Sequence, residues 1–234
     1  MSDNVVNNYN RMSGSSVIPF ILLLVLAACD NKSADDLLKE AKTFDSAQNY
    51  SKAILLYDKI LSLDINRSDI FLRRAIDKGL TNDVKGEIQD LEEIVKSEKN
   101  NVAVLYHLGV AYKSLGHYEK SIEAFSQAIR IKTSEKEEES QETGKLQSNF
   151  VSNITLPNIY FERAITFYKV DSAQKAVNDL SFAISHNYST KESYYYRALS
   201  FLKLKMIENA CVDLKKSQQN GMSEIADSIA KYCN

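Results

Sequence analysis

The chain has no tryptophan, and its 234 residues include only seven glycines and two prolines. Glycine and proline mark turns and phosphate-cradling loops, so their scarcity argues against β-sandwiches and against glycine-rich nucleotide sites. The 29 basic and 31 acidic side chains nearly balance, which gives a formal net charge of −2. The sequence therefore offers no basic stripe for a phosphate backbone, and nucleic-acid binding is not expected.

A small residue instead returns at a fixed interval within a helical pattern. Ala41, Ala75 and Gly109 are 34 positions apart, and Ala164 and Ala198 are again 34 apart after one interruption. Bulky residues recur sixteen places after each small one: Tyr57, Leu91, Phe125, Leu180 and Leu214. Others recur four places before it: Leu37, Phe71, Leu105, Tyr160 and Tyr194. This period predicts stacked helix-turn-helix units, because one such unit cannot bury its apolar face alone.

Two segments, Leu105–Ile131 and Tyr194–Ser217, carry an ordered succession of small and aromatic residues. In this respect the chain resembles the tetratricopeptide repeat family. The resemblance covers Ala34 to about Asn220. It implies an all-α fold, an α-solenoid of about five helix-turn-helix units with a C-terminal capping helix.

Two features depart from the family pattern. The proline that often ends a unit is replaced by other residues: Ile65, Lys99, Thr133 and Tyr188. The second unit has Lys78 and Glu87 where apolar or small residues are usual. The second unit is therefore the least typical of the five.

The chain divides into six predicted parts. They are a signal segment (1–28), a short tether (29–33), units one to three (34–135), an acidic polar insert (136–156), units four and five (157–220) and a capping helix (221–234).

The segment before the repeats is apolar from Val17 to Leu26 and ends in Leu26-Ala27-Ala28-Cys29. A run of this length is short of the about 20 residues that a spanning helix needs, but it suits the core of a secretion signal. The tetrapeptide resembles the bacterial lipoprotein signal, which implies cleavage before Cys29 and lipid attachment to it. An ordinary cleaved signal and a buried apolar helix are the alternatives. The start of translation is also open, because Met12 follows the segment's one basic side chain, Arg11.

The lipoprotein resemblance implies a place in the bacterial cell envelope, anchored to the inner or outer membrane with the repeats in the periplasm. Only Asp30, Asn31, Lys32 and Ser33 separate Cys29 from the first predicted helix. Such a tether reaches about 15 Å when extended, so we expect the first unit to stay near the membrane surface.

Helix-end signals mark both ends of the repeat array. Ser33 suits an N-cap, with Asp35 and Asp36 in the first turn at the positive end of the helix dipole. Gly221 suits a left-handed turn that ends the fifth unit, after which Met222–Tyr232 is predicted to form one capping helix.

The insert after the third unit is acidic, and Pro157 follows it in the first turn of the next predicted helix. Its cluster comprises Glu135, Glu137, Glu138, Glu139 and Glu142. A solvated loop or a helix extension is one interpretation. The alternative is a docking element or flap whose apolar residues fold back onto the solenoid: Phe150, Val151, Ile154 and Leu156.

Two cysteines remain besides Cys29. Cys211 and Cys233 both fall on predicted buried faces, so a disulfide and two buried thiols are both open. A hairpin turning at Gln219 and Asn220 would leave Cys233 about a helical turn, or about 5 Å, beyond its partner. Disulfides tolerate only a narrow range of Cα separations.

In the tetratricopeptide repeat family, the first helix of each unit lines a concave groove. In this chain the corresponding positions are largely apolar or aromatic: Leu72, Ile76, Tyr106, Val110, Lys113, Phe161, Ile165, Tyr168, Lys169, Tyr195, Leu199 and Lys203. Helical packing alone could explain such a stripe, but tyrosine is enriched at interfaces. We therefore expect the aromatic members to hold an extended or helical protein segment, with the three lysines favouring an acidic flank. The lysine and asparagine clamp with which some family members hold chaperone tails is missing.

Catalysis is not expected. His107, His117 and His186 fall at unrelated points of the repeat, which suggests neither a metal cluster nor a nucleophile–base pair. No cofactor is expected either. Two functions remain: a membrane-anchored protein-binding scaffold, or a nutrient- or glycan-binding accessory lipoprotein. An open groove favours the scaffold, because small ligands prefer enclosed pockets. The sequence identifies neither the partner, nor the membrane, nor the oligomeric state.

Overall fold

The structure is a computed structural model that describes residues 32–138 and 154–233, with the backbone alone at residues 135–138. The predicted signal segment, Cys29, Phe150 and Val151 lie outside the described residues. The described parts contain eleven α-helices and one short 3₁₀ turn. The helices are α1 (Ala34–Ser46), α2 (Tyr50–Leu63), α3 (Ser68–Leu80), α4 (Val84–Ser97), α5 (Val102–Ser114), α6 (Tyr118–Glu138), α7 (Leu156–Lys169), α8 (Ala173–Ser185), α9 (Thr190–Lys203), α10 (Ile207–Gln219) and α11 (Ala226–Tyr232), with η1 (Ser223–Ile225) before the last.

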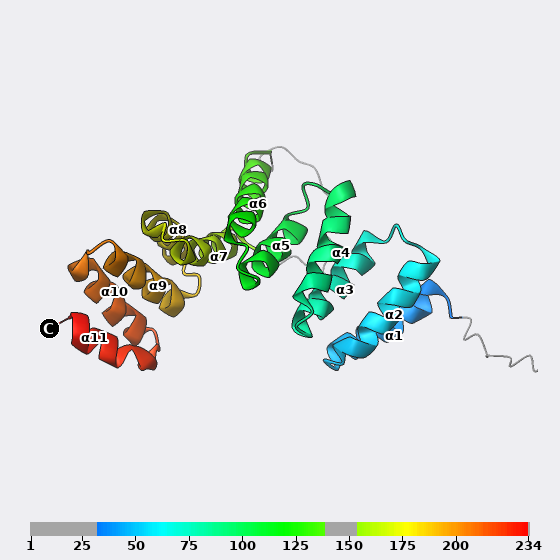
Figure 1. The fold of residues 1–234 in the computed structure, drawn as a ribbon, viewed down its shortest axis with the longest axis horizontal. Helices are drawn as coiled ribbons and strands as arrows, with labels where there is room; N and C mark the ends of the chain where they lie inside the picture. The colour runs from blue at the N-terminus through cyan, green and yellow to red at the C-terminus, as the bar shows by residue number, and fades with distance from the viewer. Residues whose placement is uncertain (1–31, 139–153, 234) are drawn as a thin grey trace, which may run out of the picture. The chain divides into compact units, whose positions relative to one another are not determined.

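Consecutive helices pack as five pairs, from α1 with α2 to α9 with α10, and each pair contacts the next one along the chain (Figure 1). The first helices of neighbouring pairs also touch, α3 with α5, α5 with α7 and α7 with α9. α11 packs against α10 at the C-terminal end. The predicted all-α solenoid of five helix pairs with a C-terminal helix is therefore confirmed.

The repeating small residues lie in the core of the helix array. Ala41, Ala75, Ala164 and Ala198 are fully buried, and so are the bulky residues sixteen places later. In the third pair, a Cβ atom added at Gly109 would lie 2.5 Å from the ring of Phe125. Glycine at this position therefore makes room for a phenylalanine, whereas alanine elsewhere faces leucine or tyrosine.

Replacing Gly109 by alanine is expected to destabilise the protein by about 1 to 2 kcal/mol. Overpacking a buried ring costs about 1 to 3 kcal/mol, and the better helix propensity of alanine returns up to about 1 kcal/mol. Chemical denaturation of Gly109→Ala measures the difference. The double variant Gly109→Ala/Phe125→Leu reproduces the Ala75 and Leu91 pair of the second unit and should recover most of the loss. Equal stability of Gly109→Ala and the parent would show that the ring is free to move.

Each turn within a pair has a residue in the left-handed region at the same repeat position. These residues have φ angles between 56° and 76°: Gln48, Asn82, Gly116, Asp171 and Lys205. The next backbone N–H donates to a carbonyl five residues earlier, as from Asp83 to Lys78 (2.8 Å) and from Met206 to Phe201 (2.9 Å). This Schellman pattern ends the first helix of every pair and sets the short turn to the second.

The helix-end predictions agree with the structure at several positions. α1 begins at Ala34 with Asp35 and Asp36 in its first turn, and Pro157 lies in the first turn of α7. Gly221 has φ 99°, as expected of the residue that ends the fifth unit.

The ends of the predicted acidic insert are also helical or packed. α6 continues to Glu138, beyond the predicted start of the insert at residue 136. At the other end, Ile154 and Leu156 pack against the core formed by α5, α6 and α7. Residues 139–153, between these ends, lie outside the described residues.

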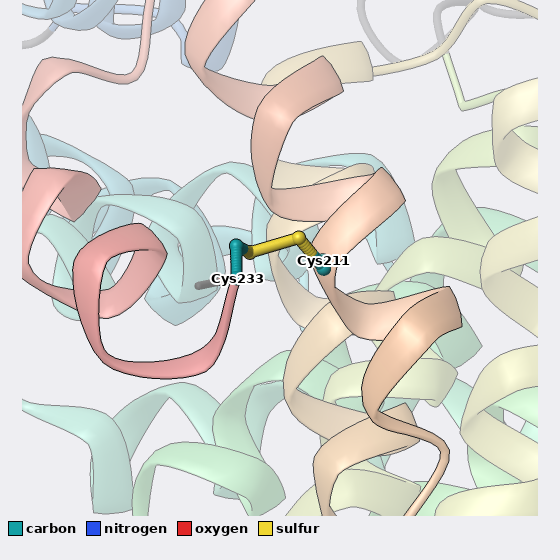
Figure 2. The surroundings of a disulfide bond; sticks show 2 residues. All are labelled: Cys211 and Cys233. Carbon is teal, nitrogen blue, oxygen red and sulfur yellow. A yellow bond between two sulfur atoms is a disulfide. The ribbon is translucent and has the colours of Figure 1, made fainter.

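The C-terminal end differs from its prediction. The single helix predicted over Met222–Tyr232 is divided into η1 and α11, and a disulfide joins Cys211 of α10 to Cys233, with the Cα atoms 5.3 Å apart (Figure 2). The prediction that Cys233 lies a helical turn too far was wrong, because it assumed one straight helix running back along α10. The 3₁₀ turn interrupts that helix, and the register of a simple hairpin does not apply.

Candidate functional site

The candidate site lies on the first helices of the third, fourth and fifth pairs. α5, α7 and α9 contact one another in order, so their equivalent positions form one surface. We call this surface the aromatic face. Its members are Tyr106 and Val110 of α5, Phe161, Ile165 and Tyr168 of α7, and Tyr195, Tyr196 and Leu199 of α9.

Most of the predicted groove residues are half-buried, as a binding surface requires. Tyr106, Ile165, Tyr168, Tyr195 and Leu199 keep part of their side chains accessible. Two others are core residues, because Leu72 and Phe161 are each only 8% exposed. Their side chains belong to the packed core and not to an accessible surface. Ile76 of α3 and Val110 are half-buried and pack against the core.

The rings that α7 and α9 contribute to the aromatic face contact one another. Tyr196 lies near Phe161, Tyr168 and Tyr195, with centroid distances of 6.4, 6.0 and 5.5 Å. Tyr188 packs on Phe161 from the turn before α9, at 5.6 Å. Edge-on contacts of this kind favour a fixed arrangement of the rings.

Sequence reasoning missed Tyr188 and Tyr196. Two signals were present, since Tyr188 occupies the position where the family often has proline and Tyr196 is the last of three consecutive tyrosines. Burial raises the pKa of Tyr196 and that of Tyr106. Their hydroxyl groups therefore stay protonated at neutral pH and can donate hydrogen bonds.

Two of the three predicted lysines are engaged within the chain. Lys113 of α5 forms an ion pair with Glu162 of α7. Lys203 of α9 pairs with Asp171 (2.5 Å), donates to the Tyr168 carbonyl (2.8 Å) and lies 4.0 Å from the Tyr168 ring centroid. Lys169 is exposed. The chain itself thus supplies acidic partners for Lys113 and Lys203, and the aromatic face depends mainly on its rings and apolar side chains.

Three arginines join helices within and between pairs, in the second, fourth and fifth pairs, and none was singled out from the sequence. Each arginine forms a two-pronged ion pair with an aspartate sixteen residues later in the same pair: Arg74 with Asp90, Arg163 with Asp179, and Arg197 with Asp213, at 2.7–2.9 Å. A third nitrogen of each donates to the second helix of the preceding pair, at Asp58, Ser126 and Ser181 respectively. We call these groups the arginine clamps. The sequence did contain a pattern that could have revealed these arginines, because one directly precedes the small residue in units two, four and five.

Each clamp arginine also lies over aromatic rings. The Arg197 guanidinium is 5.5 Å from the Tyr194 ring centroid and 5.8 Å from that of Phe201. The Arg163 guanidinium is similarly placed over Tyr160 and Phe167. Burial raises the pKa of Asp179 even though Arg163 favours its charged form. The clamps therefore place ion pairs in a largely desolvated environment, where each charge depends on its partner.

Features of catalytic or metal sites are scarce in the described parts of the chain. No group of three or more His, Cys, Asp or Glu residues within 32–138 and 154–233 could hold a metal ion. Burial lowers the pKa of His107 to about 4, so this imidazole is neutral at pH 7. A shallow pocket lies at the α4–α5 turn, lined by residues 97–101, and so is separate from the aromatic face. No helix in the described ranges has the length and apolar character needed to cross a bilayer.

Comparison with known proteins gave one match to a family model and several similar solved structures. The sequence model of the tetratricopeptide repeat matches residues 102–132, which include α5 and most of α6. A search of curated proteins gave no significant match. The crystal structure of the MamA protein is similar with a TM-score of 0.66 and 16% identity, over 85% of this chain and 94% of that one.

Two further solved structures show the same arrangement. A double mutant named MamA RS-1 ArsTM has a TM-score of 0.67 and 8% identity, over 80% of this chain and 93% of its own. TTC0263, a thermophilic tetratricopeptide repeat protein of Thermus thermophilus, has a TM-score of 0.53 and 14% identity, over 86% and 97% of the two chains. At these identities the similarity is one of fold.

Proposed function

We propose that this chain, which belongs to the tetratricopeptide repeat family, is a non-enzymatic scaffold that binds a partner polypeptide on the aromatic face. The observation that carries the proposal is the group of half-buried tyrosines on three adjacent helices, α5, α7 and α9. Tyrosine gives a large contact area with a polar tip and little conformational freedom to lose on binding.

The contacts also indicate the chemistry of the partner. Lys113 and Lys203 are paired with carboxylates of the chain, so an acidic partner would have to compete with Glu162 and Asp171. A segment with apolar or aromatic side chains needs no such exchange. The tyrosine hydroxyls can donate hydrogen bonds to its backbone carbonyls. An amphipathic helix or an extended strand with alternating apolar residues meets these requirements.

Membrane attachment through Cys29 is the second part of the proposal. It is supported by the lipoprotein-like Leu26-Ala27-Ala28-Cys29 and by the start of α1 at Ala34, directly after a four-residue tether. The scaffold then works beside a membrane of the bacterial cell envelope, with its repeats in the periplasm. Intact mass of the exported protein tests this: the mature chain should begin at a lipid-modified Cys29, and Cys29→Ala should remain uncleaved or leave the membrane fraction. An unmodified Cys29 in the exported chain would refute the anchor.

The binding face is tested by substitution and cross-linking. Tyr168→Ala and Tyr195→Ala should each weaken partner capture about 5- to 150-fold, because truncating an aromatic anchor at an interface costs about 1 to 3 kcal/mol. A photo-reactive residue at Leu199, used in intact membranes and followed by mass spectrometry, identifies the captured protein. Purified partner and variants then give the affinities.

The matched control is Tyr118→Ala, because Tyr118 is also half-buried but lies at the start of α6, a second helix of its pair. Helical content measured for all three variants guards against loss of folding. If Tyr168→Ala/Tyr195→Ala captures the partner as well as Tyr118→Ala does, the aromatic face is not the binding site.

A further inference from the structure

Two buried carboxylate oxygens stand at the contact between the first and second helix pairs. Asp45 of α1 and Asp77 of α3 are neighbours, close enough for the carboxyl group of Asp45 to raise the pKa of Asp77. Within the described residues, Asp45 Oδ1 and Asp77 Oδ2 have no donor, although both atoms are buried. Buried acceptors without a donor are rare and costly, so each needs an explanation.

The other groups around this pair do not supply a donor to those two atoms. Tyr57 of α2, which is fully buried, donates its hydroxyl to Asp45 Oδ2 at 2.5 Å. Arg73 of α3 is near enough to favour the charged form of Asp77. Two factors disfavour the charged form of Asp77: its side chain is buried, with 5% exposed, and the negative charge of Asp45 is nearby. One proton held between the carboxyl groups would satisfy both oxygens at once and remove the repulsion between them.

We propose that Asp45 and Asp77 share one proton, and that this proton fastens the first helix pair to the second. Loss of the proton leaves two negative charges in the buried contact between the first and second helix pairs. The first pair then opens away from the array more often. The contact between the first and second helix pairs thus weakens as the pH rises.

The sign of the effect follows from proton linkage. Burial, together with the neighbouring carboxyl group of Asp45, raises the pKa of Asp77 from 3.8 to about 8 in the closed contact. In the open state Asp77 returns towards its ordinary value. Between about pH 4 and pH 8 the open state therefore binds fewer protons, and opening becomes up to about tenfold more frequent per pH unit. The stabilisation is complete at low pH and is lost as the pH rises to about 8.

Hydrogen exchange of the whole chain tests the proposal. After correction for intrinsic exchange rates, opening of the α1 and α2 amides should increase between pH 5 and pH 7, by up to about 100-fold for one proton. The amides of α9 and α10 provide the internal reference. Glu87 of α4 is also buried and has a raised pKa. The comparison is therefore made in the Glu87→Gln background.

Asp77→Asn is the decisive variant, because an amide can donate to Asp45 Oδ1 at every pH. It should keep the first helix pair closed on the second and remove the pH dependence. Should this variant fail to fold, carboxyl carbon NMR of the parent gives an independent result, with Asp77 titrating near pH 8. A midpoint below pH 5, or the same slope in Asp77→Asn, would overturn the proposal. Restored protection at pH 8 on adding calcium chloride would overturn it too, since the pair would then bind a cation.

Discussion

Replacing Arg197 by leucine is expected to lower the free energy of unfolding by about 3 to 5 kcal/mol, the cost of leaving a buried charge without its partner. Asp213 is only 2% exposed and receives two hydrogen bonds from the Arg197 guanidinium, at 2.7 and 2.9 Å. The substitution also removes the hydrogen bond to Ser181 in the preceding pair. Urea denaturation of Arg197→Leu and the parent gives the difference directly.

The third helix pair offers a matched control for this prediction. At the positions of Arg197 and Asp213 it has Leu108 and Ala124, which are 6% and 7% exposed. The double variant Arg197→Leu/Asp213→Ala therefore copies an arrangement that the chain already uses. It should recover most of the loss, because apolar replacement of a whole buried ion pair is often neutral or stabilising. A double variant as unstable as Arg197→Leu would show that the Ser181 and ring contacts, and not the unpaired charge, account for the loss.

Substituting Glu87 by glutamine is expected to stabilise the protein at pH 8 and to have little effect at pH 4. Glu87 is 8% exposed and packs against Gly79 of α3, so that a Cβ atom there would lie 2.6 Å from its carboxylate. Burial raises the pKa of Glu87 from 4.5 to about 7. The folded state thus loses stability as the pH rises from about 4.5 to 7, by about 2 to 3 kcal/mol in all.

Unfolding free energies at several pH values measure this contribution. The parent should lose more stability than Glu87→Gln between pH 4.5 and 7, and the difference should be constant above about pH 7.5. Glu93→Gln is the control in the same helix, because Glu93 is exposed and forms a surface ion pair with Lys96 three residues away. It should change stability by less than about 0.5 kcal/mol. Parallel curves for the parent and Glu87→Gln would contradict the prediction.

The helix pairs were predictable because the key positions of the repeat each require a side chain of a certain size, which the residue type reveals directly. Ala75 must be small and Leu91 bulky wherever the rest of the chain lies, so a 34-residue period is enough to place them. The same reasoning identified most of the aromatic face, since the equivalent positions of adjacent first helices form one surface.

The contacts that the sequence did not predict depend on three helices at once. Arg163 joins Asp179 of its own pair to Ser126 of the preceding one, and a period of small and bulky residues carries no information on such pairing. Lys113 and Lys203 were assigned to a partner because their neighbours Glu162 and Asp171 lie on another helix or turn. The position of Cys233 depended on a change of helix type that hydrophobic periodicity does not report.

The contacts of this fold connect neighbouring helices, and this has a kinetic consequence. Chains dominated by local contacts close only short loops on the way to the native state, and they fold rapidly. Repeat arrays can start folding at any unit and extend in both directions. In this chain the C-terminal pairs are the natural starting point, because two arginine clamps and a disulfide act within a short stretch of sequence there. During synthesis, this stretch leaves the ribosome after the earlier pairs, so those pairs are made before the clamps and the disulfide can form.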